Sequence, residues 1–340
     1  MKKQDQQISI HHGNGGVHMK TLITGLFMRY FENDFLQDQS DSAVLPVNGK
    51  NIAFTTDSFV VDPLFFPGGN IGNLAICGTL NDLAVSGARP LYLSAGFIIE
   101  EGFRISKLER IVSSMAKEAK KAGVKIVTGD TKVVNSGKCD KIFINTSGIG
   151  LMDTKHIPIS SGIRVKPGDK ILLNGPPGEH GMAVMQVRKL FNFKSDLKSD
   201  CASLYPLITE ILKVTDKISF MRDATRGGVA TVVNEIAQKC KVGVEIDETC
   251  VPVNPDVRVM CEILGFDPLY IANEGKVVVV ADASDADRVL NAMRKIKTGR
   301  DAAIIGEITS DHKGKAVLKT RSGGKRILDE LMGDQLPRIC

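Results

Sequence analysis

Strand-like apolar segments alternate with helical segments along most of the chain, and this alternation restricts its possible folds more than any other feature. Residues 51–61 (NIAFTTDSFVV) have the β-branched and aromatic content of a strand, and the segment 70–90 predicts a helix that stops at Gly87. A second strand is predicted at 91–100. The next helix is predicted to open at Ser106, which with Glu109 has the spacing of a capping box. The first part of the chain therefore predicts a sheet with helices packed on it.

The second part of the chain repeats the alternation of strands and helices after a segment without a predicted element. Residues 156–169 are rich in turn formers and predict a junction, beyond which strands and helices resume up to a hairpin around Gly323-Gly324. A chain of 340 residues also exceeds the usual size of a single core. We predict an α+β protein of two α/β domains, each a mixed sheet with helices packed on it, plus a flexible C-terminal tail. The predicted division is a glycine-rich lead-in at 1–40, an N-terminal domain at 41–155, a C-terminal domain at 156–328 and a mobile tail at 329–340.

Composition argues against several classes of partner. The net charge is only +5, and the chain has four Tyr and no Trp, so a nucleic-acid-binding surface is not predicted. The N-terminus lacks the apolar core of a secretory signal, and the longest nearly apolar run, at 90–99, is too short to span a bilayer. The seven cysteines form no C-x-x-C pair. A cytoplasmic protein without a membrane or nucleic-acid partner fits these features best.

Four aspartates occupy unusual positions: Asp57, Asp82, Asp130 and Asp223. Each lies inside or at the end of an apolar segment and precedes a small, hydroxyl or hydrophobic residue. Burying a carboxylate there is unfavourable unless hydrogen bonds or a cation offset the lost hydration. Several carboxylates that converge on Mg²⁺, with phosphates as further ligands, would meet that need. The alternative for any one of them is a helix cap or turn residue.

Two glycine-rich pieces are candidate anion sites. HHGNGG contains Gly13, Gly15 and Gly16 before any predicted element, so its N–H groups could fold over an anion; the alternative is a flexible tail. Gly227 and Gly228 lie at a predicted helix start, where N–H groups favour negative charge; the alternative is a simple loop-to-helix turn. Since the sequence has no G-x-x-x-x-G-K-[ST] motif, a nucleotide site would have to be built in another way.

The last residue is a cysteine, Cys340. Chain ends usually fray, so a thiol there is either an accident or the reactive end of an arm. Lys132 and Glu274 are polar residues beside predicted strands, a position that is more often simply on the surface. The histidines lack the spacing of a helical metal pair, and no zinc site is predicted.

Taken together, the motifs resemble those of the hydrogenase maturation factor family HypE. They occur in the family's order through nearly the whole chain: HGNGG, TTDSFVVDPLFFPGGNIG, NDLAVSGARP, GDTKVV, RDATRGG, ANEGK and the terminal PRIC. Motifs of the ND and D-x-T-x-G-G types also occur in aminoimidazole ribonucleotide synthetase, selenophosphate synthetase and thiamine-monophosphate kinase. The terminal PRIC is the element that separates HypE from these relatives.

This resemblance implies an activity centred on the C-terminal thiol. HypE-like proteins accept a carbamoyl group on the sulfur of that cysteine from the carbamoyltransferase HypF. ATP then activates the carbamoyl oxygen, and loss of phosphate leaves a thiocyanate. The cyano group becomes a cyanide ligand of the [NiFe]-hydrogenase iron, delivered through the HypC–HypD complex. The resemblance further implies a homodimer formed through the N-terminal domains, with ATP held in a cleft beside them.

The resemblance also assigns roles to individual residues. It implies that Asp57, Asp82, Asp130 and Asp223 bind Mg²⁺. It implies an ATP-binding set of Gly13, Gly15, Gly16, Asp57, Asn81, Asp82, Gly129, Asp130, Thr131, Asp223, Gly227 and Gly228. Cys340 would carry the substrate, Glu274 would act as the base and Lys132 would be the next proton acceptor. The tail would move between a partner's site and its own pocket, stiffened by Pro337.

Two alternatives to this reading remain. The first is another ATP-using member of the same superfamily, such as a small-molecule kinase or synthetase. A selenophosphate synthetase would be expected to carry a reactive cysteine or selenocysteine near the N-terminal glycine loop, and none is there. The second is a non-catalytic scaffold whose Cys340 binds a metal or a partner thiol, although a lone cysteine without a nearby Cys or His is a poor metal site.

Overall fold

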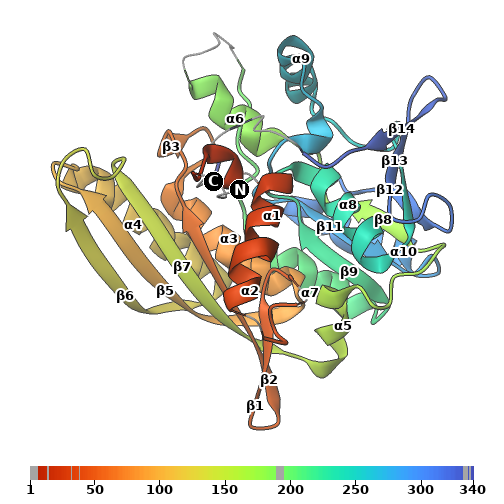
Figure 1. Cartoon of the computed structure of the whole chain (residues 1–340), viewed down its shortest axis with the longest axis horizontal. Helices are drawn as coiled ribbons and strands as arrows, with labels where there is room; N and C mark the ends of the chain where they lie inside the picture. Colours follow the sequence, from red (N-terminus) through yellow and green to blue (C-terminus); the bar gives the residue numbers. More distant parts are fainter. Residues whose placement is uncertain are drawn as a thin grey trace, which may run out of the picture.

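The computed structural model of the chain describes residues 7–13, 15–31, 33–37, 39–188, 195–331, 336 and 338–340. Two sheets lie side by side, each carrying helices (Figure 1). Both sheets combine parallel and antiparallel strand pairs. The predicted fold class, two α/β domains with mixed sheets, is thereby confirmed.

The N-terminal sheet has the order β1-β2-β7-β5-β6. Its strands are β1 (Ala43–Val47), β2 (Lys50–Phe59), β5 (Ala88–Glu100), β6 (Lys125–Val134) and β7 (Ile142–Met152). Helices α3 (Ile71–Val85) and α4 (Ile105–Ala122) pack beside each other on this sheet, and a short hairpin of β3 (Phe65–Phe66) and β4 (Gly69–Asn70) precedes α3. Because α3 also contacts elements of the second domain, its side chains are buried nearly all round. Helix α3 therefore joins the two units.

Helix α4 departs from its predicted start. It begins at Ile105, with Arg104 in the N-cap position and no side-chain cap. Ser106 therefore lies inside the first turn, where its hydroxyl cannot cap the helix, and the capping box predicted with Glu109 is wrong. The helix ends where the left-handed Gly123 (φ +70°) closes its last turn.

The C-terminal sheet has the order β14-β13-β10-β12-β8-β11-β9. Its strands are β8 (Lys170–Leu173), β9 (Ile218–Asp223), β10 (Gly243–Asp247), β11 (Val277–Ala281), β12 (Ala303–Thr309), β13 (Ala316–Lys319) and β14 (Lys325–Leu328). The helices of this half are α5 (Ile157–Ser161), α6 (Glu179–Val187), α7 (Tyr205–Val214), α8 (Gly228–Cys240), α9 (Pro255–Leu264) and α10 (Ala286–Arg294). Strand β11 is buried throughout, as expected of an uninterrupted apolar run inside a sheet covered on both faces. The predicted hairpin is confirmed, since Thr320 N–H bonds Gly324 O at 2.8 Å.

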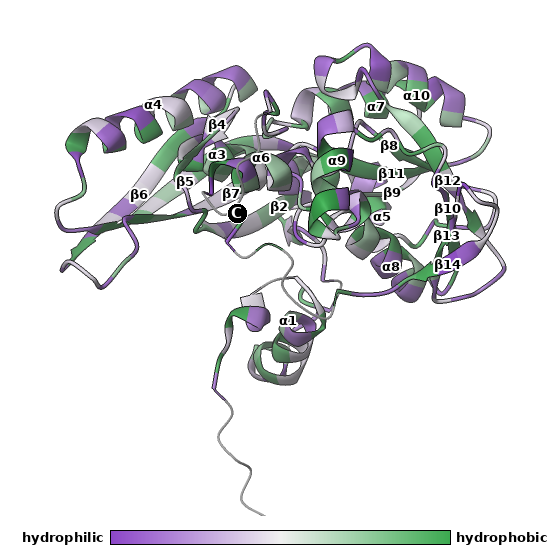
Figure 2. Cartoon of the chain, turned by 90° about the horizontal axis from the view of Figure 1, so that it is seen from above, coloured by the Kyte–Doolittle hydropathy of each residue, from purple (hydrophilic) through white to green (hydrophobic). Residues whose placement is uncertain are grey.

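A helical lead-in precedes the first sheet. It comprises the 3₁₀ turn η1 (Ile10–Gly13), α1 (Val17–Leu22), the π-helical turn η2 (Ile23–Phe27) and α2 (Met28–Tyr30). Further 3₁₀ turns are η3 (Thr154–His156), η4 (Pro268–Tyr270) and η5 (Lys297–Gly299). Figure 2 shows α1 standing away from the two sheets. Among the described residues, no helix combines the length and the apolar character needed to cross a membrane.

The end of the chain returns to the N-terminal domain. The backbone N–H of Val60 bonds Cys340 O at 3.2 Å, and that of Asp62 bonds Arg338 O at 3.3 Å. This two-bond pairing continues from the end of β2 and places the last residue between the two units. Pro337 and Asn14 lie outside the described residues, and the mobility of the tail stays a prediction.

Candidate active site

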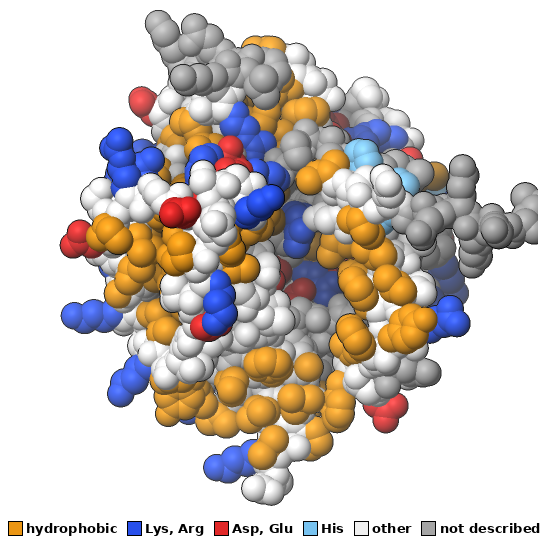
Figure 3. Space-filling model, turned by 60° about the vertical axis from the view of Figure 1, so that its left-hand side comes forward, with side chains coloured by type: hydrophobic (Ala, Val, Ile, Leu, Met, Phe, Trp, Pro, Cys, Tyr) orange, Lys and Arg blue, Asp and Glu red, His pale blue; other side chains and the backbone are white. Residues whose placement is uncertain are grey.

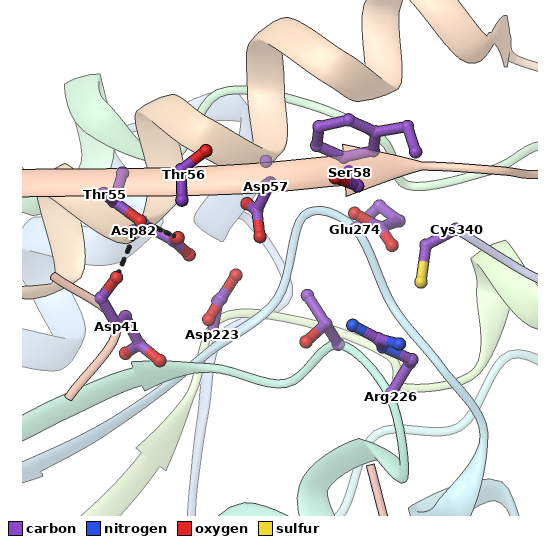
Figure 4. A pocket seen from close by; sticks show the side chains of 13 residues that line it. Asp41, Thr55, Thr56, Asp57, Ser58, Asp82, Asp223, Arg226, Glu274 and Cys340 are labelled. Atoms are coloured by element: carbon purple, nitrogen blue, oxygen red, sulfur yellow. Dashed lines mark hydrogen bonds between the residues drawn. The ribbon is translucent and has the colours of Figure 1, made fainter. Parts of the chain in front are cut away.

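A polar pocket lies between the two domains, where β2, α3, the end of β9 and the chain terminus meet (Figure 4). Its lining consists of Asp41, Thr55, Thr56, Asp57, Ser58, Phe59, Gly78, Asp82, Asp223, Thr225, Arg226, Glu274 and Cys340. Carboxylates and hydroxyls dominate this set, together with one guanidinium and one thiol. Such a surface suits a charged, hydrated ligand better than an apolar one.

Three carboxylates form the acidic end of the pocket. Asp41, Asp82 and Asp223 each offer an oxygen within 4.8 Å of the others. The Thr55 hydroxyl lies 2.7 Å from Asp82 Oδ2 and 2.8 Å from the carbonyl oxygen of Asp41, so it links two of them. Burial, followed by the neighbouring carboxylates, raises the pKa of Asp82 and of Asp223 well above the usual range. A divalent cation would relieve this repulsion, so the oxygen donor set fits Mg²⁺.

Asp57 extends the same cluster along β2. Burial raises its pKa, while Arg226 and a hydrogen bond with Asp82 lower it. Of the four predicted aspartates, Asp57, Asp82 and Asp223 are therefore brought together. Asp41 was not predicted, because it lies in a polar run before β1 and lacks the apolar context that drew attention to the others.

The fourth predicted aspartate lies elsewhere. Asp130 and Lys132 are on β6, the edge strand of the N-terminal sheet, where their side chains are both 68% exposed and form an ion pair at 2.8 Å. The hydrogen bond from Lys132 lowers the pKa of Asp130. Gly129 and Thr131 are exposed on the same strand. None of these residues lines the pocket of its own chain.

Glu274 and Cys340 lie together at the other end of the pocket (Figure 4). Glu274 is only 3% exposed, and its Oε1 has no hydrogen-bond partner within the described part of the chain. Burial and nearby carboxylates raise its pKa well above the usual range, against the opposing effect of Arg226. Burial likewise raises the pKa of the Cys340 thiol to about 11, again opposed by Arg226. Glu274, which is a strong base once its carboxyl group is ionised, thus lies beside the protonated Cys340 thiol.

Arg226 connects this pocket to the N-terminal glycines. Its guanidinium donates to Gly13 O at 2.5 Å. Gly15 has φ +81°, and a Cβ there would approach Arg226 Cβ to 3.0 Å, so the glycine segment rests directly on this arginine. Gly16 follows as the N-cap of α1. Arg226 was not predicted as a site residue, although its place between Asp223 and a glycine pair was the available signal.

Gly227 and Gly228 form the turn into α8. Their φ values are +73° and +62°, and a Cβ on Gly228 would lie 2.4 Å from Leu269 O. The turn and the close packing therefore require glycine at this point. This turn places the preceding residues, Thr225 and Arg226, at the pocket.

The loop that carries Glu274 is fixed by a buried polar network. Asp200 accepts backbone N–H bonds from Glu274 (3.1 Å) and Gly275 (3.2 Å), and it pairs with Lys276 at 3.0 Å. The Asn81 amide donates to Glu274 O at 3.3 Å and to Ala202 O at 3.1 Å. Its oxygen accepts the Leu204 N–H at 2.7 Å. Asn81, predicted as an ATP-binding residue, does not line the pocket and instead holds this loop.

Comparison with known proteins adds to this geometry. The family model described as AIR synthase related protein, N-terminal domain, matches residues 39–152, and the corresponding C-terminal domain matches residues 166–319. Carbamoyl dehydratase HypE of Rhodobacter capsulatus is 47% identical over 342 residues, covering 100% of both chains. A solved structure of hydrogenase maturation protein HypE in complex with ATP has a TM-score of 0.82 and 47% identity, covering 97% of this chain and 98% of the other. A chain in a HypE-HypF complex has a TM-score of 0.85 and 46% identity, covering 91% and 99%.

Proposed function

The chain belongs to the HypE family of carbamoyl dehydratases, and on that premise we propose that it uses ATP to dehydrate a carbamoyl group carried on its own Cys340 thiol. The product is a thiocyanate on that sulfur, which supplies the cyanide ligand of a [NiFe]-hydrogenase iron. The observation that carries the proposal is the position of the Cys340 side chain inside the pocket, beside Glu274 and Arg226.

The reaction separates into a phosphoryl transfer and an elimination. The carbamoyl oxygen attacks the γ-phosphorus, so an oxygen–phosphorus bond forms while the bond to ADP breaks. The carbon–oxygen bond then breaks as phosphate leaves, and the carbamoyl nitrogen loses both protons to give S–C≡N. Glu274 takes a proton from that nitrogen, because the same burial that raises its pKa makes its carboxylate a strong base. Lys132, whose amine must be neutral at that moment, is proposed to accept this proton from Glu274, so that Glu274 can take the second one.

The acidic end of the pocket is proposed to hold Mg²⁺. The candidate ligands are Asp41, Asp57, Asp82 and Asp223. When bound, Mg²⁺ would offset the charge of the triphosphate. Arg226, with the glycine segment resting on it, is placed to add positive charge and N–H donors toward the end that holds Glu274 and Cys340. These residues are proposed to bind and orient the nucleotide, while Glu274 accepts protons from the carbamoyl nitrogen.

A homodimer would explain the position of Asp130 and Lys132. Helices α3 and α4 pack on one face of the N-terminal sheet. The strands of this sheet also expose a set of large apolar side chains that these helices leave uncovered. That set is Val47, Phe54, Tyr92, Ile98, Ile126, Val127, Val133 and Ile149. Figure 3, in which this side of the molecule comes forward, shows hydrophobic side chains around a hollow with charged side chains at its base. A second copy that covers this surface could bring its own Asp130 and Lys132 to the pocket.

The proposed partners rest on the family resemblance and, for HypF, on a solved relative. HypF is proposed as the carbamoyl donor, since the solved HypE-HypF complex contains a chain 46% identical to this one. The HypC–HypD complex is proposed as the acceptor of the cyano group, in the cytoplasm, and no nucleic-acid or membrane partner is proposed. All of these steps require the same terminal thiol to meet more than one partner.

Mass spectrometry of the C-terminal peptide tests the proposal. The protein is incubated with carbamoyl-loaded HypF, Mg²⁺ and ATP, and the peptide ending at Cys340 is weighed over time. Addition of a carbamoyl group followed by loss of one water is the expected result, and Cys340→Ala should abolish both changes. ATP turnover that is indifferent to Cys340→Ala would instead indicate a small-molecule kinase or synthetase. Neither mass change nor turnover would indicate a scaffold.

A further inference from the structure

Arg222 lies at the acidic end of the pocket but does not line it. It belongs to β9 and directly precedes Asp223, which does line the pocket. Its side chain is only 13% exposed and pairs with carboxylates on other parts of the chain. The reaction steps proposed above give it no task. A largely buried cation beside a carboxylate cluster can offset the charge of the cluster or hold one carboxylate in place, and its contacts decide between the two.

The guanidinium of Arg222 joins three separate pieces of the chain. Its Nε donates to Asp41 Oδ2 at 3.1 Å, and its Nη1 donates to the Glu235 carboxylate on α8. Its Nη2 donates to the carbonyl of Gln39 at 2.9 Å, where the backbone has the uncommon left-handed value φ +45°. The Phe220 ring lies beside it, with 5.9 Å between Cζ and the ring centroid. One planar fork therefore serves three acceptors, which the single ammonium of a lysine cannot reproduce.

These contacts decide where Asp41 lies. The other two carboxylates of the cluster are carried by regular elements, Asp82 by α3 and Asp223 by β9. Asp41 precedes β1 and belongs to no helix or strand. Its carbonyl oxygen is 2.8 Å from the Thr55 hydroxyl (Figure 4), and the bond from Arg222 holds its carboxylate. Asp41 is thus the member of the cluster whose position depends most on a side-chain contact.

The charges around Arg222 allow this cation to serve a cation site. Asp41 and Glu235 bring two negative charges to one guanidinium, so the group as a whole does not repel a metal ion as a lone guanidinium would. Arg222 occupies only Oδ2 of Asp41. The second oxygen, Oδ1, has no hydrogen-bond partner within the described part of the chain. One oxygen therefore fixes the carboxylate, and the other is left for a ligand.

We propose that Arg222 is a positioning residue of the metal site: it holds the Asp41 carboxylate within the cluster and thereby sets the affinity for Mg²⁺. The inference rests on the proposed function, in which Asp41, Asp82 and Asp223 are candidate ligands. It adds that a side chain of the C-terminal domain, which does not line the pocket, completes a ligand set shared between the two domains.

Charge and position make opposite predictions for the loss of Arg222. If the guanidinium only adds positive charge near the site, Arg222→Met removes a repulsion and tightens the binding of a divalent cation. If it positions Asp41, the same change frees that carboxylate, leaves it near Glu235 without their shared cation, and weakens the binding. Loss of a residue that orients a metal ligand typically lowers the affinity about 10- to 100-fold.

Binding of Mn²⁺ to the full-length protein tests this contrast. Mn²⁺ prefers the same oxygen ligands as Mg²⁺, and electron paramagnetic resonance measures the free ion. Nucleotide is left out, because a triphosphate would itself bind Mn²⁺. Arg222→Met should weaken binding about tenfold or more, and Arg222→Lys should weaken it several-fold. Unchanged or tighter binding in Arg222→Met overturns the proposal.

Glu235→Gln is the matched control. It removes the other ion pair of Arg222 but leaves the bond to Asp41, so its Mn²⁺ affinity should stay within about twofold of the wild type. A loss as large as that of Arg222→Met would mean that any damage to this network weakens the metal site, and it would contradict a specific role for the bond to Asp41.

A double-mutant cycle shows whether Arg222 acts through Asp41. Asp41→Asn and Arg222→Met should each weaken Mn²⁺ binding, whereas the double variant should bind no more weakly than Asp41→Asn alone. Additive losses contradict the proposal. If Arg222→Met does not fold, Arg222→Lys replaces it in the cycle, with the same two outcomes.

The Mg²⁺ dependence of single-turnover dehydration separates positioning from general damage. Arg222→Lys should raise the half-saturating Mg²⁺ concentration several-fold, with the maximal rate restored at high Mg²⁺. A lower maximal rate at an unchanged half-saturating concentration contradicts the proposal. If the wild type binds no Mn²⁺, the proposed metal site fails and this inference fails with it. If the wild type binds Mn²⁺ and the Arg222 variants match it, only the role of Arg222 fails.

Discussion

Titration of the Cys340 thiol gives a sharp physical prediction about the tail, which is called docked when this thiol lies in the pocket and released when water surrounds it. Burial raises the thiol's pKa from 9.0 to about 11, partly offset by Arg226 and reinforced by Glu274, Asp57 and Asp223. Below pH 9 the thiol is protonated whether docked or released, so pH does not change docking through this group. As pH rises from about 9 to about 11 the released thiol ionises first, and docking weakens progressively.

The size of the effect follows from the difference between the two pKa values. At about 1.36 kcal/mol for each pH unit between them, the two values differ by about 2.7 kcal/mol, so the shift toward release is about fiftyfold at pH 11 and approaches a hundredfold above it. Protein labelled with carbon-13 at the cysteine Cβ allows the Cys340 signal to be followed by NMR, with Cys340→Ser to assign it. Docked wild-type protein should show a midpoint close to pH 11.

Arg338→Ala is the matched control for this titration, because it removes the ion pair with Asp140 and the bond to Val60 O that hold the tail beside β2. Its midpoint should move toward 9, because a larger share of its thiol is in water. A wild-type midpoint near 9 would refute the reasoning, since it would mean that the thiol is hydrated and that the tail does not occupy the pocket.

Further predictions concern the site, the loop and the sheet surface. Glu274→Gln keeps the shape of the pocket but removes the base, so single-turnover dehydration should fall about 10²–10⁴-fold with nucleotide binding retained; unchanged turnover would exclude it as the base. Asp82→Asn relieves carboxylate repulsion, so Tm without ligand should rise by about 2 °C while ATP turnover is lost; a lower Tm would contradict this. Lys276→Met leaves the buried Asp200 and the partly exposed Glu179 without their cation and should lower the free energy of unfolding by about 3–5 kcal/mol in urea denaturation, whereas a loss below about 1 kcal/mol would contradict it. Val133→Asp on the exposed sheet surface should convert a dimer to a monomer in light scattering, and a persistent dimer would locate the interface elsewhere.

Much of the fold follows from local patterns in the sequence. Strand β2, helix α3 and the β13-β14 hairpin were predicted because their signals are contained in a few neighbouring residues: β-branched content, a continuous apolar helix and a glycine turn. Helix α9 was not predicted, although Asn254 caps it and Pro255 occupies its first turn. Two of its apolar residues, Val259 and Ile263, are exposed, which blurs the amphipathic pattern.

The site was less predictable than the fold because it depends on long-range packing. Apolar context singled out Asp57, Asp82 and Asp223, since each sits on an element that runs into the core. Asp41 is brought to them only by the way the chain enters β1, which no local pattern encodes. The same context also singled out Asp130, whose strand lies at the edge of the sheet, so its carboxylate is exposed and away from the pocket of its own chain.

Isotope tracing tests most directly the claim that the carbamoyl oxygen leaves Cys340 as part of phosphate. The thiol is loaded with a carbamoyl group labelled with oxygen-18, and ATP and Mg²⁺ are then added for a single turnover. The reaction proposed here predicts one oxygen-18 atom in the released phosphate and a thiocyanate on Cys340. Unlabelled phosphate, with the labelled carbamoyl group still on the thiol, would contradict it.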